Sequence, residues 1–192
     1  MPPASPPASP FAHQHLAQEA ELSDGPCRFV RERLRLPMGL EASFGWLRHP
    51  PSVLVVPRCA DGRVLLLRRY RPAVGRWVLE FPSALLMADD SPEAGGVRLM
   101  GALTGLGCGG WRPLGVLRPN PGYSDEHMTV GLLAMEEAGE GHEDPMDASD
   151  GGLCQLQRCP PRALETALGT PQEAVDGRCV TAWVLARPHW SI

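Results

Sequence analysis

The N-terminal part of the chain shows an alternation of apolar and charged positions. In residues 27–36, CRFVRERLRL, the apolar Phe29 and Val30 are followed by charged residues, and Leu34 and Leu36 then alternate with arginines. This alternation is typical of a strand with one face exposed. The Pro-Met-Gly sequence at residues 37–39 favours a turn, after which residues 40–47 can return as a second strand. Residues 26–50 are therefore predicted to form an antiparallel β-hairpin.

Two strongly apolar runs follow, VLVV and VLLL, separated by a segment that contains Asp61-Gly62. This dipeptide is typical of a two-residue hairpin turn. The second run, residues 64–67, is apolar at every position rather than at alternate positions. Both faces of that strand should therefore be covered, and we expect it to lie in the centre of a sheet beneath helices.

The local signals for a helix begin at residues 91–93, Ser-Pro-Glu. They supply a capping serine, a proline in the first turn and an acid near the positive end of the helix dipole. Gly105 provides a stop, because glycine adopts the left-handed conformation at little cost. Within this helix lie Gly95, Gly96 and Gly101, and each costs about 1 kcal/mol relative to alanine. This glycine content indicates a helix that is loosely held in its conformation.

The rest of the chain adds further strands and helices. They are predicted at residues 111–117, 128–135 and 152–159 for strands, and at 162–168 and 178–187 for helices. Strands with a helix between them and helices behind them predict an α/β sandwich. Residues 136–150 are acidic and glycine-rich, and we interpret them as a loop.

Composition narrows the classes of partner. The chain has 192 residues, a length that suits one main domain, which is expected at residues 51–192. Its net charge of −4 gives no broad basic surface for phosphates, so no nucleic-acid partner is expected. No apolar run approaches the ~20 residues of a membrane span, and no membrane partner is expected. Residues 1–25 begin with a Pro/Ala/Ser-rich stretch without secretory features, which predicts a disordered leader and a cytoplasmic location.

Residues 84–106, ALLMADDSPEAGGVRLMGALTGL, carry an arginine and a glycine seven residues apart, Arg98 and Gly105. The segment resembles the Nudix box, G-x5-E-x7-R-E-U-x-E-E-x-G-U, where U is a bulky apolar residue. In this register Asp90 stands at the position of the first glutamate. Three further glutamate positions hold aliphatic residues, namely Leu99, Ala102 and Leu103.

Positions 99, 102 and 103 are spaced i, i+3 and i+4, so they share one face of the predicted helix. Three carboxylates there would form an oxygen-rich surface suited to Mg²⁺. Aliphatic groups cannot bind the ion, and the usual platform for Mg²⁺ is missing. If the protein is active it requires Mg²⁺, and the remaining candidate ligands are Asp90 and Glu93; otherwise no cofactor is expected.

Three other segments resemble the ADP-ribose pyrophosphatase branch of the Nudix hydrolases in the order that this branch shows. They are residues 30–50 (VRERLRLPMGLEASFGWLRHP), 65–86 (LLLRRYRPAVGRWVLEFPSALL) and 111–128 (WRPLGVLRPNPGYSDEHM). The resemblance implies a Nudix fold, which is an α/β/α sandwich with a mixed sheet, here preceded by the N-terminal hairpin. It also implies a nucleotide-diphosphate ligand and a homodimer built by the hairpin.

The resemblance assigns roles to single residues. Arg71 matches an arginine near the substrate diphosphate, and Arg98 matches the arginine that orients the glutamates of the box. Glu80 matches an acid near the metal cleft, and Glu126 matches an acid of the turn close to the substrate. The acidic loop occupies the place of a loop that donates a general base, for which Glu143 is the candidate alongside Asp144.

Each of these residues also has a structural interpretation. Arg71 can be a surface residue at a strand end, and Glu80 can belong to an ion pair. Glu126 can stabilise its turn, and acids in a loop such as Glu143 are commonly just solvated.

Three hypotheses for the function remain open. In the first, Mg²⁺-dependent diphosphate hydrolysis is lost or weak while nucleotide-diphosphate binding is retained. In the second, displaced acids support an active diphosphatase. In the third, the chain is a non-catalytic dimeric interaction module.

Overall fold

The computed structural model describes residues 12–137 and 153–190. The chain divides into two compact units, one formed by residues 1–50 with 120–126 and the other by residues 51–119 with 127–192. The candidate Glu143 lies outside the described residues.

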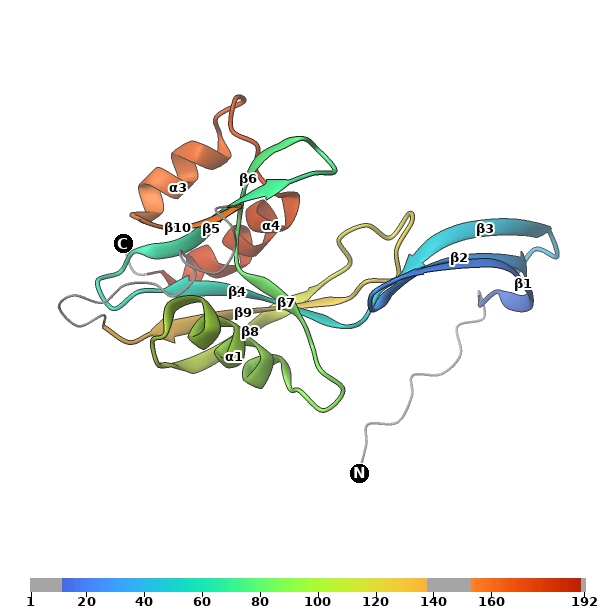
Figure 1. Cartoon of the computed structure of the whole chain (residues 1–192), viewed down its shortest axis with the longest axis horizontal. Helices are drawn as coiled ribbons and strands as arrows, with labels where there is room; N and C mark the ends of the chain where they lie inside the picture. Colours follow the sequence, from blue (N-terminus) through green and yellow to red (C-terminus); the bar gives the residue numbers. More distant parts are fainter. Residues whose placement is uncertain (1–11, 138–152, 191–192) are drawn as a thin grey trace. The chain divides into compact units, whose positions relative to one another are not determined.

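The N-terminal unit is a three-stranded antiparallel sheet of β1 (Gln14–Asp24), β2 (Cys27–Arg35) and β3 (Glu41–Arg48), in that order (Figure 1). On β2, Val30 and Leu34 are buried and alternate with exposed residues, as the sequence pattern predicts. Glu32 lies on the same buried face, which the pattern does not predict, and it pairs with Arg48 on β3. The predicted antiparallel pairing of the two strands after residue 26 is confirmed.

Strand β1 corrects the prediction of a disordered leader that extends to residue 25. Only the first part of that segment is rich in Pro, Ala and Ser, and residues 14–24 pair along the whole of β2. Polar contacts across the sheet reinforce this pairing, because Glu19 accepts hydrogen bonds from Arg31 on β2 (3.1 Å) and from Ser43 on β3 (2.8 Å). The partners of these residues are distant in sequence, so composition alone does not reveal the strand.

The second unit contains a seven-stranded mixed sheet. Its main path runs β10-β5-β4-β9-β8, with β6 paired to β5 and β7 paired to β4. Strands β4 and β9 are parallel, and the other pairs are antiparallel. The strands are β4 (Ser52–Arg58), β5 (Val64–Arg71), β6 (Arg76–Glu80), β7 (Ser83–Leu85), β8 (Cys108–Leu117), β9 (Met128–Met135) and β10 (Cys154–Cys159).

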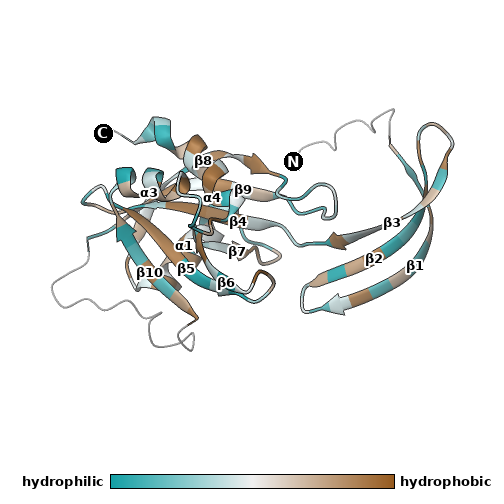
Figure 2. Cartoon of the chain, turned by 90° about the horizontal axis from the view of Figure 1, so that it is seen from above, coloured by the Kyte–Doolittle hydropathy of each residue, from teal (hydrophilic) through white to brown (hydrophobic). Residues whose placement is uncertain are grey.

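Helices cover both faces of this sheet, which gives the predicted α/β/α layers (Figures 1 and 2). On β4, Val53 and Val55 belong to the apolar cluster beneath one helix, whereas Leu54 and Val56 belong to the cluster on the opposite face. The first cluster packs against α1 (Pro92–Thr104). The second packs against α3 (Pro161–Leu168), α4 (Gly177–Ala186) and the residue that follows the short helix η1 (Arg187–His189).

Strand β5 is an inner strand, and residues Val64–Leu67 are all buried, as their uninterrupted apolar run predicts. The middle strand of the main path is β4, so the expected central position of β5 is met only in part. The turn before β5 differs from the expected two-residue hairpin. Strands β4 and β5 share the pair Arg58–Val64, and Cys59 and Arg63 continue the turn with a backbone hydrogen bond of 2.8 Å. Most of β5 pairs with β6 and β10, so the strand is shared among partners that local sequence does not identify.

Helix α1 begins and ends where the sequence predicts. The Ser91 side chain accepts a hydrogen bond from the Ala94 backbone N–H at 3.1 Å, and Gly105 has a φ of 67° at the C-terminal cap. The same helix corrects the interpretation of its glycines as a sign of loose structure. A Cβ on Gly95 would lie 2.5 Å from Leu86, and one on Gly96 would lie 3.1 Å from Trp111. Both glycines therefore let the helix lie close to the sheet.

No helix within the described ranges is long and apolar enough to cross a membrane.

Candidate active site

The centre of the candidate site is an ion pair between Arg71 at the end of β5 and Glu80 at the end of β6. The guanidinium donates two hydrogen bonds, from Nε to Oε1 and from Nη2 to Oε2, each 2.6 Å long. Strands β5 and β6 are antiparallel neighbours, with Arg71 opposite Arg76 and Glu80 opposite Leu67. The Glu80 residue is 3% exposed, whereas Arg71 is partly exposed. Hydrogen bonding to Glu80 raises the pKa of Arg71.

This pair lines a cleft of about 660 Å³ on the second unit. The volume lies within the range of pockets that hold small organic ligands. Two further arginines reach the cleft, Arg76 and Arg178, and one further acid, Asp176. The basic side chains outnumber the acidic ones, and the cleft is suited to an anionic ligand. Its lining residues are Arg71, Ala73, Val74, Arg76, Val78, Glu80, Ala174, Val175, Asp176 and Arg178.

Helix α4 positions part of this lining. Asp176 is its N-cap, and its carboxylate accepts hydrogen bonds from the Arg178 backbone N–H (2.8 Å) and from the Arg178 Nε (2.8 Å to Oδ2). The next residue, Cys179, is buried, and burial raises the pKa of its thiol to about 12. The thiol is therefore protonated near neutral pH and unsuited to act as a nucleophile.

A second ion pair joins Asp90 and Arg98 at the beginning of α1. The Asp90 carboxylate also accepts a hydrogen bond from the Met87 backbone N–H at 3.1 Å. The Arg98 guanidinium, together with the Met87 N–H, holds the pKa of Asp90 below its ordinary value. The sequence placed Asp90 among the candidate metal ligands and Arg98 among the ligand-binding residues, and the structure brings the two together.

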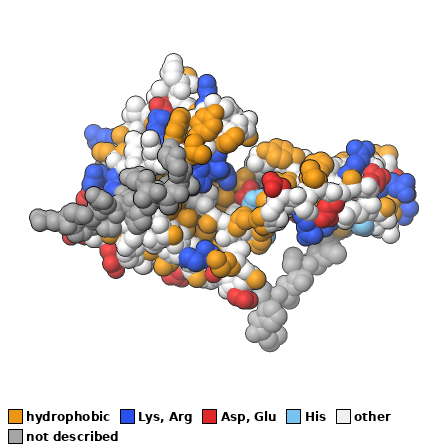
Figure 3. Space-filling view, viewed as in Figure 1, with side chains coloured by type: hydrophobic (Ala, Val, Ile, Leu, Met, Phe, Trp, Pro, Cys, Tyr) orange, Lys and Arg blue, Asp and Glu red, His pale blue; other side chains and the backbone are white. Residues whose placement is uncertain are grey.

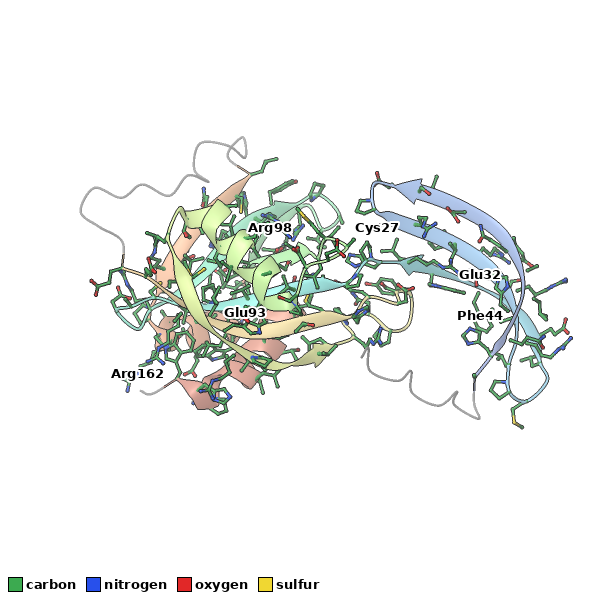
Figure 4. The ribbon with its side chains drawn as sticks, turned by 90° about the horizontal axis from the view of Figure 1, so that it is seen from below. Cys27, Glu32, Phe44, Glu93, Arg98 and Arg162 are labelled. Atoms are coloured by element: carbon green, nitrogen blue, oxygen red, sulfur yellow. The ribbon has the colours of Figure 1, made fainter. Side chains whose placement is uncertain are left out.

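The other candidate metal ligand, Glu93, is exposed in the first turn of α1 (Figure 4). In the described residues no three His, Cys, Asp or Glu side chains gather in a way that could hold a metal ion.

The three aliphatic replacements in the box differ in burial. Leu103 is 8% exposed and belongs to the apolar cluster between α1 and the sheet. Leu99 is partly buried and packs against the same cluster, whereas Ala102 is exposed. Where a metal-binding helix would carry carboxylates, α1 thus carries one core residue, one residue at the edge of the core and one short surface residue.

Glu126 belongs to the N-terminal unit, in the turn that pairs with β3. Leu47 donates a backbone hydrogen bond to Tyr123 (2.7 Å) and accepts one from Asp125 (3.1 Å). The buried Glu126 carboxylate lies 3.8 Å from Nδ1 of His49. These contacts connect Glu126 with the strand β3 that precedes it in the chain.

Sequence reasoning missed Asp176, Arg178 and Arg76 as lining residues of the cleft. The Asp-Gly sequence before the last helix is a recognisable N-cap, which predicts a local contact between Asp176 and the helix. The placement of Asp176 beside β6 depends on backbone hydrogen bonds between residues far apart in the chain. The Leu79 N–H donates to the Ala174 carbonyl (2.8 Å), and the Asp176 N–H donates to the Leu79 carbonyl (3.0 Å).

Comparison with known proteins finds relatives in sequence and in fold. An ADP-ribose pyrophosphatase of Mycobacterium tuberculosis is 30% identical over 125 residues, which cover 63% of this chain and 60% of that protein. An ADP-ribose pyrophosphatase of Bacillus subtilis is 26% identical over 117 residues, 59% of this chain and 63% of that protein. The crystal structure of an ADP compounds hydrolase has a TM-score of 0.72, covering 92% of this chain and 93% of that chain at 19% identity. In sequence the chain is similar to these ADP-ribose pyrophosphatases, and in fold it is similar to the ADP compounds hydrolase.

The matched region spans about three fifths of the length of the two pyrophosphatases. A methanol dehydrogenase activator of Bacillus methanolicus is 27% identical over 138 residues, which cover 70% of this chain and 75% of that protein. No protein-family model matches the chain. The resemblance to ADP-ribose pyrophosphatases found in the three sequence segments is thus confirmed by these relatives, and the expected fold is confirmed by the solved structure.

Proposed function

We propose that this chain is a Nudix protein that binds a nucleoside-diphosphate compound in the cleft around Arg71. Its Mg²⁺-dependent hydrolysis of such compounds is lost or weak. The observation that carries the proposal is the aliphatic face of α1, where Leu99 and Leu103 pack into the core beside Ala102. A metal-assisted attack of water on a diphosphate needs ions to lower the pKa of the water and to neutralise developing charge. This helix offers no carboxylate at those three positions.

The chemistry of the cleft supports retained binding. Glu80 uses Nε and Nη2 of Arg71, so Nη1 can donate to a phosphate oxygen while the ion pair persists. The buried carboxylate fixes the guanidinium plane, which lowers the entropic cost of ligand binding. Arg76 and Arg178 add positive charge around the same volume. Diphosphate oxygens have the complementary charge and geometry.

An activity assay joined to a binding assay tests this function. With ADP-ribose and Mg²⁺ or Mn²⁺, we expect no release of AMP above the uncatalysed rate, whereas the ligand raises the melting temperature of the protein. The Arg76→Glu variant should lose most of that shift, because it reverses a charge that lines the cleft. Arg162→Glu is the matched control, since it makes the same change on the exposed surface of α3 outside the lining.

Sustained AMP release by the unmodified protein would establish the active diphosphatase instead. A melting temperature that no nucleotide sugar changes would favour the non-catalytic interaction module.

The N-terminal sheet supports the further proposal that the protein is a homodimer. Leu22 on the edge strand β1 lies opposite Phe29 on β2, and these residues are 72% and 49% exposed. Figure 3 shows further hydrophobic side chains at the surface of this unit. Apolar side chains on a sheet with an open edge favour association with a second copy.

We expect light scattering to give the mass of a dimer, and Leu22→Glu to shift the mass towards that of a monomer. The exposed side chain contributes little to the fold of a single copy, so the variant should remain folded. Ser23→Glu adds the same charge to the next residue, which points to the other face of β1. A dimer that survives Leu22→Glu and dissociates in Ser23→Glu contradicts this choice of face.

A further inference from the structure

A second pocket lies on the sheet face that α4 and η1 cover. It has a volume of about 270 Å³, and its lining residues are Arg58, Gly110, Arg112, Leu132, Ala134 and His189. Three of these six residues are basic and none is acidic. Along β4, Arg58 follows Leu54 and Val56 at alternate positions, which places it on the face opposite to α1. The pocket is therefore separate from the helix that carries the degenerate box.

The pocket is also separate from the cleft around Arg71. Helix α4 has its N-terminus at that cleft, where Asp176 and Arg178 lie, and its C-terminus leads into η1 with His189. A helix of this length extends for about 15 Å. The two sites thus flank opposite ends of the same helix.

The cationic groups are held without carboxylates. The Arg58 guanidinium carbon lies 5.5 Å from the centroid of the Trp190 ring, in a cation–π contact. Trp190 is itself fixed, because its Nε1 donates to the Gly62 carbonyl at 3.0 Å and its ring packs on Trp183 at 5.3 Å. This aromatic support orients Arg58 and leaves its guanidinium donors available to a ligand.

On the other wall, Nη1 of Arg112 lies 3.4 Å from Nδ1 of His189. In the part of the chain that the structure describes, neither Arg58 nor Arg112 pairs with a carboxylate. The register of β8 shifts between Gly109 and Arg112, and Gly110 has a φ of 64°. Such a bulge takes backbone groups out of the ladder and bends the strand beside the pocket.

From this arrangement we infer that the pocket binds the phosphate group of a small molecule. Two guanidinium groups and an imidazole can surround a phosphate dianion with donors and balance its charge. The volume lies just below the range typical of drug-sized ligands, so a compact anion fits better than a whole dinucleotide. Inorganic phosphate and a small phosphate monoester share this chemistry. The inference that this pocket binds a phosphate group does not depend on the function proposed for the Arg71 cleft.

Titration calorimetry of the full chain with inorganic phosphate, and separately with ribose 5-phosphate, tests the inference. We expect saturable binding of at least one of them, and an affinity reduced about tenfold or more in Arg112→Gln and in Arg58→Gln. Tighter binding of ribose 5-phosphate than of phosphate identifies a monoester as the ligand, and the reverse order identifies the free ion. Arg162→Gln, on the exposed surface of α3 and outside both linings, should leave this affinity unchanged.

The imidazole signals of His189 provide a readout at the pocket itself. They should shift on addition of the anion in the unmodified protein and remain unchanged in Arg112→Gln. If Arg58, Arg112 and His189 serve only to stabilise the negative end of α4, both variants lower the melting temperature yet bind phosphate as before, and the inference is overturned. Loss of phosphate binding in Arg76→Gln alone also overturns it, because the anion then occupies the Arg71 cleft.

Discussion

Replacing both Leu99 and Ala102 with glutamate creates affinity for Mg²⁺ on helix α1. The two positions are three residues apart on one helix face, so their carboxylates can approach one hydrated ion. If the new site has a dissociation constant of about 1 mM, Mg²⁺ at about 10 mM stabilises the protein by about 1.4 kcal/mol. For a chain of this size the melting temperature should rise by about 3–5 °C, which differential scanning calorimetry measures.

The matched control is Leu99→Gln/Ala102→Gln, which has the same shape without the negative charge. Its melting temperature should not respond to Mg²⁺, and neither should that of the unmodified protein. Leu103 is left in place, because it is 8% exposed and a glutamate there would be buried in the apolar cluster. If the double glutamate variant folds and ignores Mg²⁺, then positions 99 and 102 do not face the site that the register of the box implies.

Local sequence signals determined much of the fold. The start of α1 at Ser91 and its end at Gly105 depend on capping chemistry within a few residues, and both were predictable. The burial of β5 as an inner strand followed from its uninterrupted apolar run. Each of these features depends on residues close to one another in the chain.

Features that depend on distant partners were missed or misinterpreted. Strand β1 forms because residues 14–24 pair along β2, and the leader composition that precedes it gives no sign of this. The cleft was predicted only in part, since Arg71 and Glu80 were identified separately while their pairing remained an alternative. Asp176 enters the cleft through backbone contacts between β6 and the segment before α4. No local pattern encodes such contacts.

The glycines of α1 show how the same residue type can have opposite roles in one helix. From sequence alone, Gly96 and Gly101 have equal cost. In the structure Gly96 lies against Trp111 on β8, whereas nothing lies within 4 Å of a Cβ placed on Gly101. The Trp111 ring also covers Gly131 on β9, where a Cβ would overlap its atoms. Trp111 therefore packs against two glycines, one on the helix and one on the sheet.

This arrangement predicts two alanine substitutions with effects of opposite sign. Gly131→Ala should lower the free energy of unfolding by about 1–3 kcal/mol, because the methyl group and the Trp111 ring compete for one volume and Gly96 limits the movement of the ring. Gly101→Ala should raise it by about 0.5–1 kcal/mol, because it adds helix propensity and meets open space. Urea unfolding monitored by tryptophan fluorescence measures both changes.

Adding Trp111→Leu to Gly131→Ala separates packing from backbone effects. The smaller side chain makes room for the methyl group, so Gly131→Ala should cost less in the Trp111→Leu background than in the unmodified protein. Equal cost in both backgrounds would mean that Gly131 is required by its backbone conformation. Because β9 lies between β4 and β8 and α1 packs on all three, the expected coupling would identify Trp111 as a contact that fixes α1 over the sheet. The face of α1 that bears Leu99 and Leu103 is then held in place by packing against the sheet.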